Sequence, residues 1–225
     1  MTNNKHTVSA FDQDIDNIRG LIAEMGSRAE TALTNAMQAL ATNDHDLALE
    51  TAKGDKAIDA LEIEVEKLIV QTIALRAPMA DDLRELIADL KMSAVIERIG
   101  DYSKNIAKRV RRLETRAFIE QSDAIPRMAA ITGEMLRMVM DAYARRDVDM
   151  AKAVSERDNE VDQLFKELFV DLVGFIAKHP DAAQEVAHLL VGSKNIVRIG
   201  DHTVTCAEMI YFTETGQHLG LDEPV

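Results

Sequence analysis

Apolar residues recur every three or four positions through most of the chain, which is the spacing of one face of an α-helix. A first stripe that includes Phe11 predicts a helix over about 9–42, and a second predicts a helix over about 44–75. Pro78 ends the second helix, because proline lacks a backbone donor and clashes with the preceding turn. A third helix follows and is expected to end near Thr115. Short turns between these segments predict an antiparallel three-helix bundle.

The second half of the chain repeats this order of elements. Pro126 stands where the first turn of a fourth helix is expected, a position at which proline is tolerated. A fifth helix is predicted over about 147–178, Pro180 repeats the earlier break, and a sixth helix is predicted over about 181–214. The tail over 216–225 is expected to be loose. No segment shows the alternation of apolar and polar residues that is typical of a strand.

An internal duplication explains this repetition. The segment VIERIGDYSKNIA at 95–107 returns in altered form as IVRIGDHTVTCA at 196–207, with Gly100 aligned to Gly200. Glycine inside a helix costs about 0.5–1 kcal/mol relative to alanine, so both glycines are expected to mark a close approach of a neighbouring helix. The predicted fold is all-α, a tandem pair of antiparallel three-helix bundles made of six long helices, with domains at 1–118 and 119–225.

Charge and composition exclude or disfavour several classes of function. The chain has 26 basic and 39 acidic side chains, a net charge of −13, which disfavours binding to nucleic acid and to anionic lipid. Cys206 is the sole cysteine, so an internal disulfide and a CxxC motif are excluded. The start of the chain has no apolar leader and no stretch is apolar enough to cross a membrane, so we expect a cytoplasmic protein without direct membrane insertion.

Two pairs of carboxylates in the first half are predicted to converge. Asp55 and Asp59 lie four residues apart on the second helix, and Glu97 and Asp101 do so on the third, so each pair shares a helix face. Counting outward from the turn near Pro78 places the two pairs opposite each other. Close carboxylates repel unless a cation lies among them, and oxygen ligands suit hard cations such as Mg²⁺, Ca²⁺, Mn²⁺ or iron. The sequence therefore predicts a metal site in an open surface groove.

The second half carries a reduced version of this arrangement. The same counting places Asp158 opposite Asp201, but Asp162 lies opposite Val197. Three carboxylates thus replace four. Because a lost anionic ligand weakens attraction for the ion, we expect the first half to bind metal more tightly.

Other interpretations of these residues stay open. The carboxylates could be ordinary solvated charges paired with Arg98 and neighbouring lysines, on a metal-free helical scaffold. A carboxylate-bridged di-metal oxidase or storage protein of the helical-bundle type is another alternative, but such bundles use two ExxH motifs and this chain has the one at Glu185–His188. No motif for a nucleotide-binding loop or a nucleophile appears.

The RIGD segment, with Glu97 four residues before Asp101, resembles the signature of the PhoU family, and the resemblance covers nearly the whole chain. Segments 82–84 (DLR) and 105–107 (NIA) resemble family segments too, although the second half departs from both. The resemblance implies multinuclear iron or zinc clusters on the two bundles. The positions that match the family's metal motifs are Asp55, Asp59, Glu97, Asp101, Asp158, Asp162 and Asp201.

The same resemblance implies a function. It implies a non-enzymatic negative regulator of the phosphate regulon that couples a phosphate ABC transporter to a sensor kinase. The implied partners are the ATPase subunit of that transporter and the phosphate-sensing histidine kinase. A homodimer is expected, and nucleic acid is not expected among the partners.

Overall fold

The computed structural model describes residues 3–113, 118–119 and 122–219. Within these residues it contains α-helices, one short 3₁₀ helix and no strand. The helices are α1 (Asn3–Thr42), α2 (His45–Gly54), α3 (Lys56–Arg76), α4 (Asp81–Val110), α5 (Ala124–Arg145), α6 (Val148–Lys178), η1 (Pro180–Ala182) and α7 (Ala183–Thr215).

Equivalent aspartates begin the corresponding helices of the two halves. Asp44 accepts hydrogen bonds from the backbone amides of Asp46 and Leu47 at the start of α2, at 3.0 and 2.9 Å. Asp147 accepts one from Met150 at the start of α6, at 2.9 Å. Such caps satisfy amide groups that have no partner inside the helix, and a negative side chain there also complements the helix dipole.

The second predicted helix is interrupted, and in this respect the sequence-based prediction was wrong. Asp55 separates α2 from α3, and its carbonyl oxygen accepts hydrogen bonds from both Ile58 and Asp59, at 2.8 and 3.2 Å. This is the tighter spacing of a 3₁₀ turn, and it follows Gly54, a residue of low helix propensity. The interruption places the Asp55 side chain at a junction of two helices.

The ends of the helices differ from the prediction at several points. Helix α1 begins earlier, at Asn3, and α4 ends earlier, at Val110; the expected end at Thr115 lies outside the described residues. A short 3₁₀ turn from Pro180 to Ala182 precedes α7. No helix in the described part of the chain is long and apolar enough to cross a membrane.

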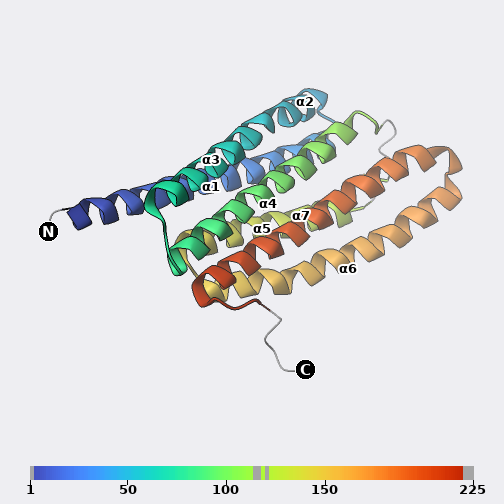
Figure 1. Ribbon diagram of the computed structural model, residues 1–225. Coiled ribbons are helices and arrows are strands. Elements are labelled where there is room, and N and C mark those ends of the chain that lie inside the picture. The colour runs from blue at the N-terminus through green and yellow to red at the C-terminus, as the bar shows by residue number, and fades with distance from the viewer. Residues whose placement is uncertain (1–2, 114–117, 120–121, 220–225) are drawn as a thin grey trace.

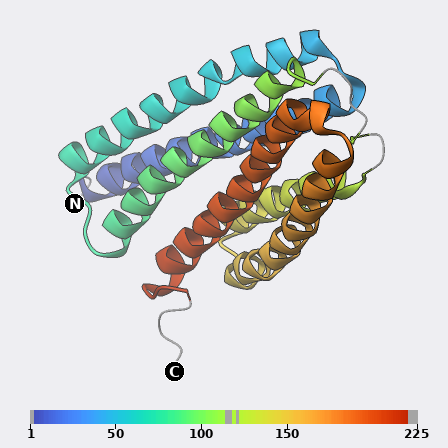
Figure 2. The same cartoon turned by 90° about the vertical axis from the view of Figure 1, so that its right-hand side faces the viewer.

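Two three-helix bundles lie side by side. Helices α1, α2–α3 and α4 form the first bundle, and α5, α6 and α7 form the second. Figure 1 shows α4 and α7 next to each other in the middle, with α3 outside α4 and α6 outside α7. Helices α1 and α5 pack together behind them, so the two bundles meet through both pairs, as Figure 2 shows from the side. The predicted all-α tandem fold is confirmed.

The predicted apolar stripes supply most of the core, but Leu83 and Ile87 of α4, which the helical spacing also placed on a stripe, are 37% and 38% exposed. In α1 the side chains of Ile18, Ile22, Met25 and Ala29 are fully buried. The buried stripe of α4 continues along the contact between the two bundles. Isoleucines of α4 are buried there, as are the isoleucines at the aligned positions of α7. Burying such a side chain fully contributes about 1.5–3 kcal/mol, so helices of this length are stabilised mainly by one another.

The aligned glycines lie at close approaches between helices, as predicted from the duplicated sequence. A β-carbon on Gly100 would lie 2.8 Å from Ile58 Cδ1 and 3.4 Å from Asp55 Oδ1. A β-carbon on Gly200 would lie 2.6 Å from Asp158 Oδ1. The missing side chain therefore makes room for Ile58 in the first half and for Asp158 in the second.

Candidate functional site

The first acidic cluster consists of Asp55, Asp59, Glu97 and Asp101, as predicted from the sequence. Asp55 lies at the α2–α3 junction and Asp59 in the first turn of α3, while Glu97 and Asp101 face them from α4. The cluster is less open than expected, because Asp55 is only 4% exposed. Its Oδ1 atom is buried and has no hydrogen-bond partner among the described residues. A buried carboxylate oxygen without a partner is costly, so this cluster has unsatisfied capacity to bind a donor or cation.

Lys104 supplies a cation to this cluster. Its ammonium group lies between Asp55 and Asp101 and forms a hydrogen-bonded ion pair with each. Burial alone would lower the pKa of Lys104, but the hydrogen bonds to Asp101 and Asp55 raise it above its ordinary value. Lys104 therefore stays charged and ties α4 to the α2–α3 junction.

The lysine does not neutralise the whole cluster. Burial, followed by the charges of Asp55 and Asp101, raises the pKa of Asp59, although Lys104 opposes the change. Burial and the charge of Asp101 likewise raise the pKa of Glu97, despite Arg98. Arg98 is 63% exposed and lies 3.8 and 3.9 Å from Glu97 and Asp101, distances at which an exposed pair contributes little. Negative charge remains in excess here.

The second acidic cluster consists of Asp158 and Asp162 on α6 and Asp201 on α7. Burial, followed by the charges of Asp201 and Asp162, raises the pKa of Asp158 to about 6. Lys194 only partly offsets these effects. The predicted gap is present, because Val197 is 1% exposed and belongs to the core. The position that aligns with Lys104 holds Val204, so this cluster also lacks the internal lysine.

Aromatic and cationic side chains lie between the two clusters. Tyr102 of α4 stacks on His202 of α7, with ring centroids 5.4 Å apart, and these are aligned positions of the duplication. The guanidinium of Arg198 lies over the Tyr102 ring, 5.6 Å from its centroid. Burial, with the charges of Arg98 and Arg198, lowers the pKa of His202, although the charge of Asp201 opposes the change. Contacts of Tyr102 with His202 and Arg198 thus join α4 to α7 beside the acidic clusters, whereas Ile99 and Ile199 of the RIGD segments are buried.

The sequence predicted the carboxylates and left open that neighbouring lysines pair with them, but it did not single out Lys104. The signal was available, since Lys104 lies three residues after Asp101 and on the same helix face. As the side chains are placed, the described residues contain no group of three or more His, Cys, Asp or Glu side chains that could hold a metal ion. Glu185 and His188, considered for di-metal chemistry, line a separate cleft with Arg111 and Arg112.

Known proteins resemble the chain over nearly its whole length. The family model described as "PhoU domain" matches residues 22–110 and 125–210. A protein of Zymomonas mobilis, named "Phosphate-specific transport system accessory protein PhoU homolog", is 45% identical over 95% of this chain and 90% of its own length. The Escherichia coli K12 protein "Phosphate-specific transport system accessory protein PhoU" is 31% identical over 98% of this chain and 92% of its own length.

Solved structures agree with the sequence comparisons. The crystal structure of PhoU from Pseudomonas aeruginosa superimposes with a TM-score of 0.86 at 28% identity, covering 92% of this chain and 100% of that one. PhoU from Streptococcus pneumoniae gives the same TM-score of 0.86 at 23% identity, which supports the fold. Since the PhoU domain model matches two segments and the Zymomonas mobilis relative is 45% identical over 95% of this chain, the chain belongs to the PhoU family.

Proposed function

We propose that this protein is a cytoplasmic, non-enzymatic regulator of phosphate uptake that restrains the phosphate-starvation response when phosphate is plentiful. The observation that carries the proposal is similarity along almost the entire chain to proteins named as accessory to phosphate-specific transport. The fold suits a binding role, because α4 and α7 pack together and each carries residues of one acidic cluster, with Tyr102 of α4 stacked on His202 of α7.

The chemistry of the described side chains supports binding rather than catalysis. Cys206, the one thiol of the chain, is fully buried, and burial raises its pKa to about 12. A thiol in that state is a poor nucleophile, because the thiolate is the reactive form. The His202 ring is stacked on Tyr102, with ring centroids 5.4 Å apart.

The acidic clusters are proposed to bind metal cations, iron or zinc by the family resemblance. The donor type fits, because the buried Oδ1 of Asp55 has no hydrogen-bond partner among the described residues, and burial together with nearby carboxylates raises the pKa values of Asp59 and Glu97. Asp55, Asp59, Glu97 and Asp101 would hold the cation in the first half. The residues of the second half would be Asp158, Asp162 and Asp201. A bound cation would supply positive charge that joins neighbouring helices.

Cation binding in the first cluster requires the ammonium group of Lys104 to leave. Lys104 has a flexible side chain that is 21% exposed, so solvent lies within its reach. A divalent cation in its place would interact with more carboxylate oxygens than a single ammonium group can. We propose that lysine and metal are alternative occupants of this cluster.

Two partners follow from the proposal, namely the ATPase subunit of the phosphate transporter and the phosphate-sensing histidine kinase, with the protein acting as a homodimer. The test is co-purification of the tagged protein from cells grown in high phosphate. We expect both partners to be recovered by mass spectrometry, and fewer after replacement of Arg98 and Arg198 by glutamate in the RIGD segments. Recovery of neither partner at any phosphate concentration would contradict the proposal.

A further inference from the structure

A second polar site, remote from the acidic clusters, joins the two bundles near the turn between α5 and α6. Asp89 on α4 is 2% exposed, and its Oδ1 accepts a hydrogen bond from the Tyr143 hydroxyl of α5 at 2.9 Å. The carboxylate belongs to the first bundle and the tyrosine to the second. This buried hydrogen bond therefore links the two bundles directly.

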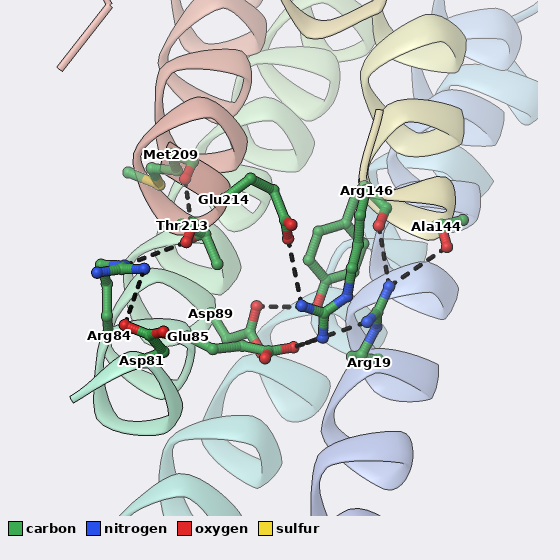
Figure 3. Close-up of polar contacts among 11 residues, drawn as sticks. Arg19, Asp81, Arg84, Glu85, Asp89, Ala144, Arg146, Met209, Thr213 and Glu214 are labelled. Carbon is green, nitrogen blue, oxygen red and sulfur yellow. Dashed lines mark hydrogen bonds and ion pairs between the residues drawn. The ribbon is translucent and has the colours of Figure 1, made fainter. Parts of the chain in front are cut away.

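Ion pairs at the contact between the two bundles surround the cavity beside Asp89. Figure 3 shows Arg146, at the end of α5, between Glu85 of α4 and Glu214 of α7. Arg19 of α1 donates to the carbonyl oxygen of Tyr143 at 3.0 Å and lies 3.6 Å from Glu85. Beside them, Arg84 of α4 donates to the carbonyl oxygen of Thr213 at 3.1 Å and pairs with Asp81. We call Asp89, Tyr143 and these ion-pairing residues the latch.

The environment of Asp89 is unfavourable for its ionised form. Its Oδ2 atom is buried without a hydrogen-bond partner among the described residues. The adjoining cavity of about 20 Å³ has room for about one water molecule, which is far from a full hydration shell. The charged or titratable groups that face Asp89 are Arg19 of α1, Glu85 of α4, Tyr143 and Arg146 at the end of α5, and Glu214 of α7.

Burial affects the pKa of Asp89 more than these neighbouring groups do. It raises the pKa of Asp89 to about 7, with Glu85 adding to the effect, while the Tyr143 hydrogen bond and the charges of Arg19 and Arg146 oppose it. Burial and the nearby Asp89 carboxylate raise the pKa of Tyr143 as well, so the hydroxyl keeps its proton and remains the donor.

We propose that the protonation state of Asp89 controls the contact between the two bundles. The protonated acid keeps the latch closed, and loss of the proton favours separation of α4 from α5 and α7 at this end. An ionised carboxylate is poorly solvated in the closed junction and is hydrated once the junction opens. The two bundles thereby have a closed and an open arrangement, and the equilibrium between these arrangements depends on pH near neutrality.

The direction of the effect follows from proton linkage. The pKa of Asp89 is about 7 in the closed form, compared with 3.8 for an unperturbed aspartate. The closed form therefore binds more protons between these values, and opening becomes more favourable as pH rises. The opening constant should rise about tenfold per pH unit up to about pH 7 and become constant above it.

The test measures opening by the reactivity of a buried thiol. Met92, which lines the cavity beside Asp89, is replaced by cysteine in a chain that also carries Cys206→Ala. The rate of thiol labelling, divided by that of the urea-unfolded chain at the same pH, gives the opening constant. Between pH 5 and pH 8 it should rise about a hundredfold with Asp89 present.

Two further variants distinguish the proposal from general pH sensitivity. Asp89→Asn mimics the protonated acid and should make the opening constant nearly independent of pH. Tyr143→Phe removes a hydrogen bond that favours the carboxylate, so the midpoint should move to higher pH. An opening constant that is flat with Asp89 present, or that keeps its full pH dependence in Asp89→Asn, would overturn the proposal.

Discussion

Replacing Asp101 by asparagine is expected to abolish the tighter class of metal sites in a titration of the purified protein with iron or zinc. The substitution removes an anionic ligand from the first acidic cluster, which offers four carboxylates where the second offers three. Each lost anion removes a bond and part of the attraction that offsets dehydration of the ion. Asp201→Asn is the matched control, since it alters the aligned position, and it should affect only the weaker class.

A substitution of Lys104 and a change of pH distinguish metal binding in the first cluster from metal binding in the second, in the same titration. Lys104→Met removes the competing ammonium group and should strengthen binding in the first cluster alone. Binding in the second cluster should weaken as pH falls through about 6, where Asp158 takes up a proton. Equal affinity in both halves, or loss of the tighter class in Asp201→Asn instead of Asp101→Asn, would contradict this account of the clusters.

Gly100→Leu is expected to destabilise the protein by about 1–3 kcal/mol, the usual cost of overpacking a core. A β-carbon there would already lie 2.8 Å from Ile58 Cδ1, and the larger side chain would also press on Asp55. The loss should lower the midpoint of urea unfolding and reduce metal binding together, because Asp55 belongs to the first acidic cluster.

Gly174→Leu provides a control within α6, since a β-carbon on Gly174 would meet no atom within 4 Å. Leucine has the higher helix propensity, so this variant should be as stable as the original chain or slightly more stable. An unchanged midpoint in Gly100→Leu would show that α4 does not need a glycine against α3.

The hydrophobic pattern predicted the fold well, because both bundles are built from stripes that repeat at the helical period. It did not predict the break at Asp55. A glycine within a helix is tolerated often enough that Gly54 alone does not indicate an interruption. The junction depends on local hydrogen bonds to the Asp55 carbonyl group, and these leave no periodic signal in the sequence.

The candidate sites were predictable to different extents. Counting outward from one turn located Asp55 opposite Asp101, because antiparallel helices fix that register. It could not show that the Lys104 side chain points into the cluster. Nor could it find the latch, whose residues Asp89 and Tyr143 come from different halves and meet only because of how the bundles pack.

The central claim, that this protein restrains the phosphate-starvation response, is tested most directly by deleting its gene and measuring expression of phosphate-starvation genes in high phosphate. We expect these genes to stay expressed at a high level in the deletion strain, because a restraint on the kinase is lost, and to be repressed again when the intact chain is supplied on a plasmid. Normal repression in the deletion strain would contradict the claim.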